Sequence, residues 1–169
     1  IEDRGHETGV HVHCAWAGFK EGPHYDLGTG FHVKDSIADH SEEVQRELLS
    51  EAVDCIRTWS GKDPKSFRAG NFGADRHTLK ILADLGLTTD SSRNASINKL
   101  DELGKINAVH EAEGLLEVPA TSFEALEKPR RMMRFIDPSN MTVDEARSVF
   151  EQVVELGIGA IVLVTHSFQ

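Results

Sequence analysis

FRAGNFGADRHTLKILADLGLTTDSS, residues 67–92, is the stretch of the sequence that decides the fold. Residues 66–70 are typical of a short strand. Asp75 can cap the helix that follows, because its carboxylate can accept hydrogen bonds from the first helical turn, and the apolar residues after it recur at helical spacing. Gly86 ends this helix, and residues 87–90 predict a second strand. A strand, a helix and a strand in succession favour a parallel sheet covered by helices.

The rest of the chain continues this alternation on both sides of the central unit. Further strands are predicted at residues 9–14, 115–118 and 161–164, and further helices from Asp39 or Ser41 to Gly61 and from Thr142 to Gly157. The last strand, IVLV, is a continuous apolar run of the kind that is buried on both faces of a sheet. Residues 91–114 show no clean period, so we expect an irregular excursion there with a short helix at 98–103.

Composition limits the classes of protein to which this chain can belong. Its 169 residues suit one domain, and 18 basic against 28 acidic residues give a formal net charge of −10, which disfavours nucleic-acid binding. The sequence contains no apolar run of the roughly 18 residues needed to span a bilayer, and its first residues do not resemble a signal peptide. Two distant cysteines without CxxC spacing favour a reduced, cytoplasmic setting. Nothing in the sequence indicates an oligomeric state.

Polar side chains follow the predicted strands, at the positions where each strand ends. In a β/α barrel the C-terminal ends of the strands converge on one mouth, so these groups would meet there. They are His11 and His13, Arg68 with Asn71, Asp90 with Ser91 and Ser92, Thr121 with Ser122, and Thr165 with His166 and Ser167.

The HxH pair of His11 and His13 is the candidate metal site. Side chains alternate along a strand, so both imidazoles lie on one face, about 7 Å apart at Cα, and both can reach a single ion. Six of the nine histidines lie in the first 40 residues, which is a further indication of a metal or acid–base site. An exposed polar face on an edge strand is the alternative interpretation. A metal of this type also needs a carboxylate or a third histidine.

Arg68 and His166 are the candidate catalytic residues. An arginine at the end of a core strand needs an anionic partner to offset its desolvation, which implies a carboxylate at the site. The alternative for Arg68 is a structural ion pair with one of the 28 acidic residues. His166 follows the buried run IVLVT, where it can act as a general acid or base, or be a hydrogen-bonded core residue.

Four stretches of the chain together resemble the polysaccharide deacetylase superfamily of metal-dependent carbohydrate esterases. They are GHETGVHVH (5–13), the stretch 67–92, EVPATSF (117–123) and VLVTHSF (162–168), in that order. The resemblance spans nearly the whole chain, and 67–92 is its most specific part. It implies an α/β fold, namely a partial, distorted (β/α) barrel with a mostly parallel sheet, formed as a single catalytic domain over residues 1–169.

The resemblance also implies a site. The family binds a divalent metal, often zinc, through one aspartate and two histidines, and a second aspartate is the base. His11 matches the first histidine ligand, Arg68 the arginine that orients the base, and His166 the histidine that protonates the leaving group. The family's second histidine would fall at Ala15, so His13 is assigned instead from the HxH geometry.

The implied activity is hydrolysis of an N- or O-linked acetyl group on a cell-surface or lipopolysaccharide sugar, with zinc as the expected cofactor and a carbohydrate as the partner. The alternatives are hydrolysis of a non-sugar C–N bond on the same fold, and a non-catalytic carbohydrate-binding relative. The family's aspartate motif belongs upstream of Ile1, so we expect a fragment of a longer protein, truncated at the N-terminus and also at the C-terminus. A processed N-terminus is the alternative. Expressed alone, this chain is expected to bind zinc weakly and to have little deacetylase activity.

Overall fold

A mostly parallel five-stranded sheet forms the first part of the molecule in the computed structural model, which describes residues 5–15, 35–97, 106–127 and 130–166. Its strands lie in the order β1 (Val10–Val12), β2 (Ser66–Ala69), β3 (Thr89–Asp90), β5 (Leu115–Glu117) and β4 (His110–Ala112). The first four are mutually parallel, and only β4 is antiparallel to its neighbour. Within the described ranges the sheet is open, with β1 and β4 at its edges.

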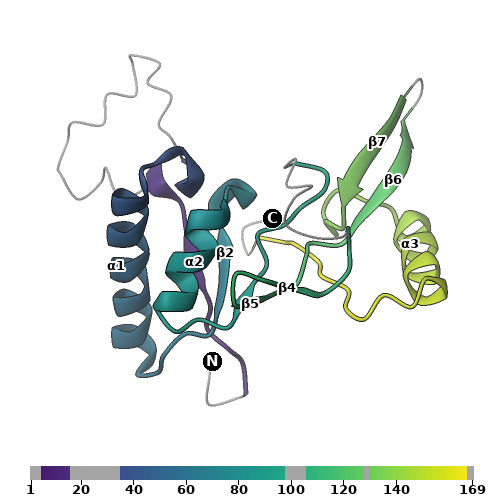
Figure 1. Ribbon diagram of the computed structural model, residues 1–169. Coiled ribbons are helices and arrows are strands. Elements are labelled where there is room, and N and C mark those ends of the chain that lie inside the picture. Colours follow the sequence, from purple (N-terminus) through teal and green to yellow (C-terminus); the bar gives the residue numbers. More distant parts are fainter. Residues whose placement is uncertain (1–4, 16–34, 98–105, 128–129, 167–169) are drawn as a thin grey trace.

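Two helices pack beside this sheet (Figure 1), and both begin and end where the sequence predicts. α1 (Glu42–Ser60) begins at Ser41, whose hydroxyl accepts a hydrogen bond from the Val44 amide, and it ends at Gly61 with a φ of 73°. α2 (Arg76–Asp84) begins at Asp75 with a reciprocal capping box. The helix signals were reliable because caps and C-terminal glycines act within a few residues of the backbone that they satisfy.

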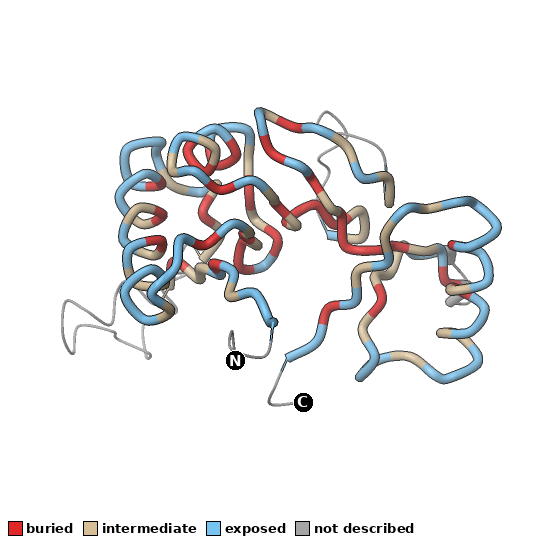
Figure 2. Tube along the Cα trace, turned by 90° about the horizontal axis from the view of Figure 1, so that it is seen from below, coloured by how far each residue is buried: buried red, intermediate tan, exposed pale blue. Residues whose placement is uncertain are grey.

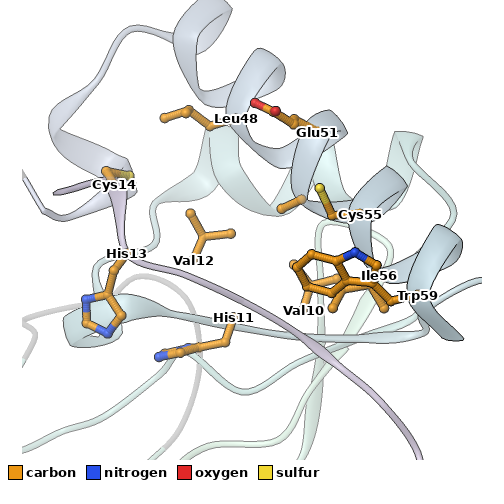
Figure 3. A pocket seen from close by; sticks show the side chains of 11 residues that line it. Val10, His11, Val12, His13, Cys14, Leu48, Glu51, Cys55, Ile56 and Trp59 are labelled. Atoms are coloured by element: carbon orange, nitrogen blue, oxygen red, sulfur yellow. The ribbon is translucent and has the colours of Figure 1, made fainter. Parts of the chain in front are cut away.

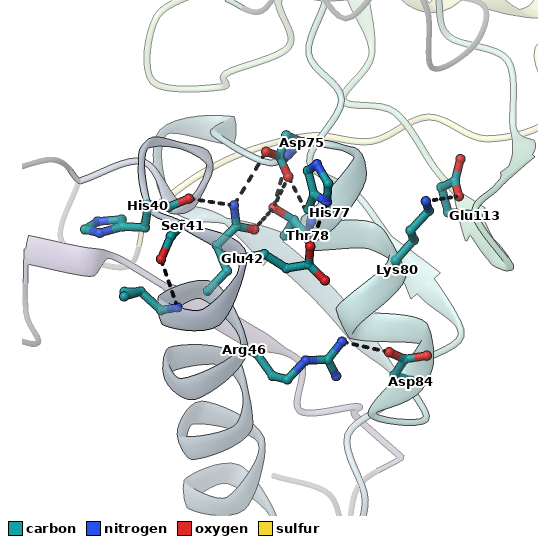
Figure 4. A network of polar contacts seen from close by, with 12 residues as sticks. His40, Ser41, Glu42, Arg46, Asp75, His77, Thr78, Lys80, Asp84 and Glu113 are labelled. Carbon is teal, nitrogen blue, oxygen red and sulfur yellow. Dashed lines mark hydrogen bonds and ion pairs between the residues drawn. The ribbon is translucent and has the colours of Figure 1, made fainter.

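Buried Gln45 joins the two helices. Its amide donates to the His40 carbonyl at 3.1 Å, and its side-chain oxygen accepts from the Thr78 hydroxyl at 2.7 Å. The outer edge of the same contact carries the ion pair between Arg46 and Asp84 at 2.9 Å (Figure 4). The main apolar core lies between the helices and the sheet, and it includes Leu49, Leu79, Leu82, Phe67 and Leu115.

A hairpin and a third helix form the second part of the molecule (Figure 1). The hairpin pairs β6 (Ser122–Glu127) with β7 (Arg130–Phe135), and α3 (Val143–Glu155) packs its Val149 and Val153 with Ile136. The predicted capping box of Thr142 and Glu145 is confirmed. The hairpin was not predicted from the sequence.

Two predictions about strands are wrong. Residues 161–164 form an extended segment outside either sheet, because Val162 hydrogen-bonds with Thr121 and Val164 with Ile136. Within this segment Ile161 and Leu163 are exposed, and only Val164 is buried. Figure 2 shows the described chain before the C-terminus as mostly exposed.

The second correction concerns residues 91–114, which contain the short strand β4 where an irregular excursion was expected. A turn at Glu113 and Gly114, both with positive φ, folds β4 back onto β5. The short helix expected at 98–103 lies outside the described residues. In the described part of the chain, no helix is both long and apolar enough to cross a membrane.

Candidate active site

The edge strand β1 places His11 and His13 side by side. The two imidazole centroids are 4.9 Å apart, with the ring planes at 85° (Figure 3). This arrangement follows from strand alternation, because both residues project on the same side of β1 while Val10 and Val12 project on the other. Parallel pairing sets His11 opposite Arg68, and the His11 Nδ1–H donates to the Arg68 carbonyl at 2.7 Å.

His13 is oriented by Asp35, a residue that the sequence analysis did not single out. The His13 Nδ1 lies 2.7 Å from Asp35 Oδ2, and both side chains are about one quarter exposed. The same carboxylate accepts from the Ala15 amide at 3.0 Å and from the Asn71 amide group at 2.6 Å. Burial acts to raise the pKa of Asp35, but these hydrogen bonds outweigh it and hold the pKa below its usual value. Asp35 is therefore an anion oriented toward His13.

The hydrogen bonds at Nδ1 determine which nitrogen of each ring could bind a metal. With Nδ1 acting as the donor, the lone pair of a neutral imidazole is on Nε2. Burial is the main influence that lowers the pKa of His11, and the positive potentials of His13, Arg68 and His166 lower it further. The neutral ring is favoured as a result. A carboxylate or carbonyl partner on the opposite nitrogen is the usual arrangement of metal-binding histidines in proteins.

Gly70 allows this close packing. An added Cβ there would lie 2.6 Å from the Val12 carbonyl oxygen and 2.8 Å from the His13 ring. The residue after it, Asn71, adopts a left-handed conformation with a φ of 52° and directs its amide to Asp35. The sequence FRAGNFG therefore determines both where β2 ends and how the His13 ring is positioned.

Arg68 and His166 lie with His11 around one cavity of about 390 Å³, whose wall also includes Ser66, Ser91 and Thr165. Arg68 Nε donates to the Ser91 carbonyl at 3.1 Å, and its Nη2 donates to the Ser91 hydroxyl at 2.8 Å. The direct partners of this arginine within the described residues are therefore neutral, where the sequence analysis expected a carboxylate. His166 is exposed and also lines this cavity.

His13 lines a neighbouring groove of about 250 Å³, and His11 borders both spaces. The groove lies between β1 and α1, with Leu48, Ile56 and Trp59 among its apolar walls (Figure 3). The structure thus brings three of the four predicted residues to one cavity and places the fourth beside it.

Two buried carboxyl groups lie behind Arg68. Asp90 on β3 and Glu117 on β5 are opposite each other in the parallel register and are only 1% and 3% exposed. Negative potential from both favours the charged form of Arg68, although burial has the larger effect and lowers its pKa. Neither carboxyl reaches the cavity wall, and no acidic side chain is among the described residues that line it. Glu7 does not line the cavity either, but it accepts a hydrogen bond at 2.7 Å from Ser66, which does.

The ring centroids of the histidine pair lie 4.9 Å apart, and binding of one divalent metal by both rings stays a prediction. Over the described ranges, no group of three or more His, Cys, Asp or Glu side chains that could hold a metal ion is found. Asp35 and Glu117 are the functional candidates that sequence reasoning missed. Asp35 has no spacing signal because it contacts His13 across 22 residues, whereas Glu117 could have been noticed as an acid in a predicted core strand.

No protein-family model matches this sequence, and no curated protein matches it either. A comparison with solved structures finds a likeness to the crystal structure of a "putative polysaccharide deacetylase" from Mycobacterium smegmatis, with a TM-score of 0.51 and 21% sequence identity. The match covers 79% of this chain and 46% of that chain, so this chain corresponds to about half the length of that protein. A likeness at this identity shows the fold alone. The chain is therefore a mixed α/β protein that shares its fold with this deacetylase-type structure.

Proposed function

We propose that this chain is a metal-dependent carbohydrate deacetylase domain that hydrolyses an N- or O-linked acetyl group on a cell-surface or lipopolysaccharide sugar. One observation carries the proposal: the imidazoles of His11 and His13 lie in edge contact, and Arg68 and His166 lie around one cavity with His11. The shared fold supports the same conclusion. In this proposal the sheet is part of a distorted β/α barrel, and the cavity is at its mouth.

His11 and His13 would hold the metal, expected to be zinc, through Nε2 of each ring. The Nδ1 atom of His11 bonds the Arg68 carbonyl, and the Nδ1 atom of His13 bonds Asp35. These two hydrogen bonds orient both rings and do not involve Nε2. When bound, the metal supplies Lewis-acid polarisation of the acetyl carbonyl and lowers the pKa of water. Two protein ligands leave further positions for water, substrate or a carboxylate.

Arg68 and His166 supply the other groups that acetyl hydrolysis needs. Arg68 is held by two hydrogen bonds to Ser91, so its guanidinium presents a fixed positive charge to the cavity, where it can orient an anionic base. His166 is exposed on the cavity wall, where its ring can hold a proton and deliver it to the departing amine or alcohol.

A non-catalytic carbohydrate-binding protein is the second candidate, and one observation favours it. None of the described residues around the cavity is acidic, so the base that a hydrolase requires is not among them. In this case the cavity would bind an acetylated sugar without cleaving it. Hydrolysis of a non-sugar C–N bond, such as a cyclic amide, would use the same groups on a different substrate.

Cobalt titration tests the metal site. Co²⁺ bound by imidazole absorbs visible light, so binding is followed directly and without any assay of activity. We expect one cobalt per chain, a large loss of affinity in His11→Gln and His13→Gln, and no change in His77→Gln, a matched control on the exposed surface of α2. Equal spectra for all four proteins would refute the proposed metal site.

Acetate release separates the candidate functions. The zinc-loaded chain is incubated with acetylated glucosamine oligomers or with a cyclic amide, and the products are quantified. Slow zinc-dependent acetate release that is lost in His166→Ala supports the deacetylase. Ring opening of the cyclic amide alone supports the other hydrolase, and saturable oligomer binding without turnover supports the binding protein.

A further inference from the structure

Asp90 and Glu117 form a pair of adjacent buried carboxyl groups. They are register partners on adjacent parallel strands, so their side chains lie next to each other on one face of the sheet, and both are almost fully buried. A carboxylate can only accept hydrogen bonds, so one member of such a pair must be protonated and donate. Two ionised carboxylates at this separation in a buried site would repel each other strongly.

The remaining contacts of the two groups favour Glu117 as the protonated member. Both Asp90 oxygens accept hydrogen bonds, Oδ2 from the Ser92 amide at 3.0 Å and Oδ1 from the Ser92 hydroxyl at 2.7 Å. Glu117 accepts from the Arg93 amide through Oε1 at 3.2 Å. Among the four oxygens, Oε2 of Glu117 accepts none of these three hydrogen bonds, which makes it the candidate to carry a hydrogen. The donors around Asp90 stabilise an anion there.

The pKa of Glu117 is shifted in the direction that this assignment requires, and the pKa of Asp90 is raised as well. Burial, the charge of Asp90 and the hydrogen bond between the two groups raise the pKa of Glu117 to about 10. Burial raises the pKa of Asp90 as well, but the hydrogen bonds from Glu117, Ser92 and the Ser91 backbone act in the opposite direction.

The pair is connected to the cavity through a single residue. Ser91 follows Asp90 directly, accepts both hydrogen bonds from the Arg68 guanidinium, and donates its own hydroxyl to the Val118 carbonyl at 2.7 Å. Val118 follows Glu117 directly in the sequence. Ser91, which anchors Arg68, and Val118, which accepts from Ser91, are thus the two residues that follow the acid pair in the sequence.

We propose that Glu117 is held as a neutral carboxylic acid that donates its proton to Asp90, and that the single negative charge on Asp90 is the buried counter-charge that positions Arg68 through Ser91. Asp90 and Glu117 are then positioning residues, since neither reaches the cavity. Arg93, whose amide bonds Glu117, is the other cation whose charge acts on this acid. The effect of Arg68 on acetyl hydrolysis rests on the proposed function, but the site of the proton does not.

Glutamine at position 117 distinguishes this arrangement from a generic buried polar contact. Glu117→Gln keeps an oxygen to accept from the Arg93 amide and gains an N–H to donate to Asp90, so it reproduces the acceptor and the donor of the neutral acid. Asp90→Asn instead removes the negative charge and places N–H donors against donors from Ser92 and Glu117. The proposal therefore requires strong asymmetry between two amide substitutions of similar size.

The experiment measures the proton first and the arginine second, on the metal-free chain. Infrared spectra at neutral pH should show the carbonyl stretch of one buried protonated carboxyl group, absent in Glu117→Gln and retained in the control Glu111→Gln, which alters an exposed acid on β4. At neutral pH Glu117→Gln should unfold at or above the wild-type thermal midpoint, because the amide has no proton to release on unfolding, and it should keep the Arg68 Nε–H resonance in NMR spectra. Asp90→Asn should shift that resonance or fail to fold.

Two results would overturn the proposal. One is a spectrum in which the protonated band persists in Glu117→Gln, and the other is a displaced Arg68 resonance in that variant. Ser91→Ala tests the link to Arg68 separately, and an unmoved Arg68 resonance in it would refute that link. A chain that binds no cobalt would refute the proposed function and leave these readouts unaffected.

Discussion

Gly70→Ala should displace His13 and destabilise the protein by a calculable amount. The new Cβ would lie 2.6 Å from the Val12 carbonyl oxygen and 2.8 Å from Cγ and Nδ1 of the His13 ring. The carbonyl belongs to β1 and cannot withdraw without breaking the pairing of β1 with β2, so the ring must move. Moving it breaks the 2.7 Å hydrogen bond to Asp35.

Two effects add up in this variant. Overpacking costs about 1–3 kcal/mol. Loss of the hydrogen bond adds about 1 kcal/mol, a value at the low end because both side chains are partly exposed and Asp35 keeps two other donors. The sum is about 2–4 kcal/mol, which lowers the thermal midpoint of a domain of this size by roughly 4–16 °C.

The assay is thermal unfolding followed by circular dichroism, with a cobalt titration on the folded protein. Gly159→Ala is the matched control, because a Cβ there meets no atom within 4 Å. We expect the control to behave as wild type and Gly70→Ala to lose both stability and metal affinity. If the two variants had the same midpoint and cobalt affinity, Gly70 would not be the residue that allows His13 its position.

The remaining predictions test the cap of α3, the buried acid and the partner of His13. Thr142→Ala removes one half of the capping box with Glu145 and should cost about 1 kcal/mol in urea unfolding, whereas an unchanged midpoint would show that the cap contributes nothing. Glu117 keeps its proton in the native state up to a pKa of about 10, and the unfolded chain releases that proton near 4.5, so the free energy of unfolding should fall as pH rises between these values. The slope is at most about 1.4 kcal/mol per pH unit, and it should be smaller in Glu117→Gln; equal slopes would contradict the assignment. Asp35→Ala removes the hydrogen-bond partner of the His13 ring and should weaken cobalt binding about 10- to 100-fold. An unchanged cobalt affinity would show that Asp35 does not orient His13 for metal binding.

Local signals in the sequence determined most of the regular structure. The helices α1, α2 and α3 begin at polar caps and end near glycines, as predicted, because a cap satisfies backbone groups only three or four residues away. The common face of His11 and His13 was predictable for a similar reason, since alternation is a property of the strand itself. Arg68 could be placed because β2 is a short apolar strand and Arg68 lies near its C-terminal end.

The tertiary structure alone decided the contacts between distant residues. Residues 161–164 have the composition of a buried strand, yet they hydrogen-bond with Thr121 and Ile136 outside the sheets. The pattern of apolar residues in a segment does not indicate which other segment it will pair with. The β6–β7 hairpin escaped prediction because its sequence, SFEALEKPRRMMRF, lacks clean alternation and contains a proline.

The same distinction holds for the candidate site. The sequence could indicate two histidines on a strand face, but the bond from Asp35 to His13 spans 22 residues, and the register of β3 and β5 sets Asp90 against Glu117 across 27 residues of chain. Side-chain partners of this kind are selected by packing and desolvation, which depend on the whole fold rather than on neighbouring residues. The sequence by itself therefore indicated His11, His13, Arg68 and His166 as candidates, and the tertiary structure decided their orientation and their partners, because packing and desolvation act between residues that are distant in the chain.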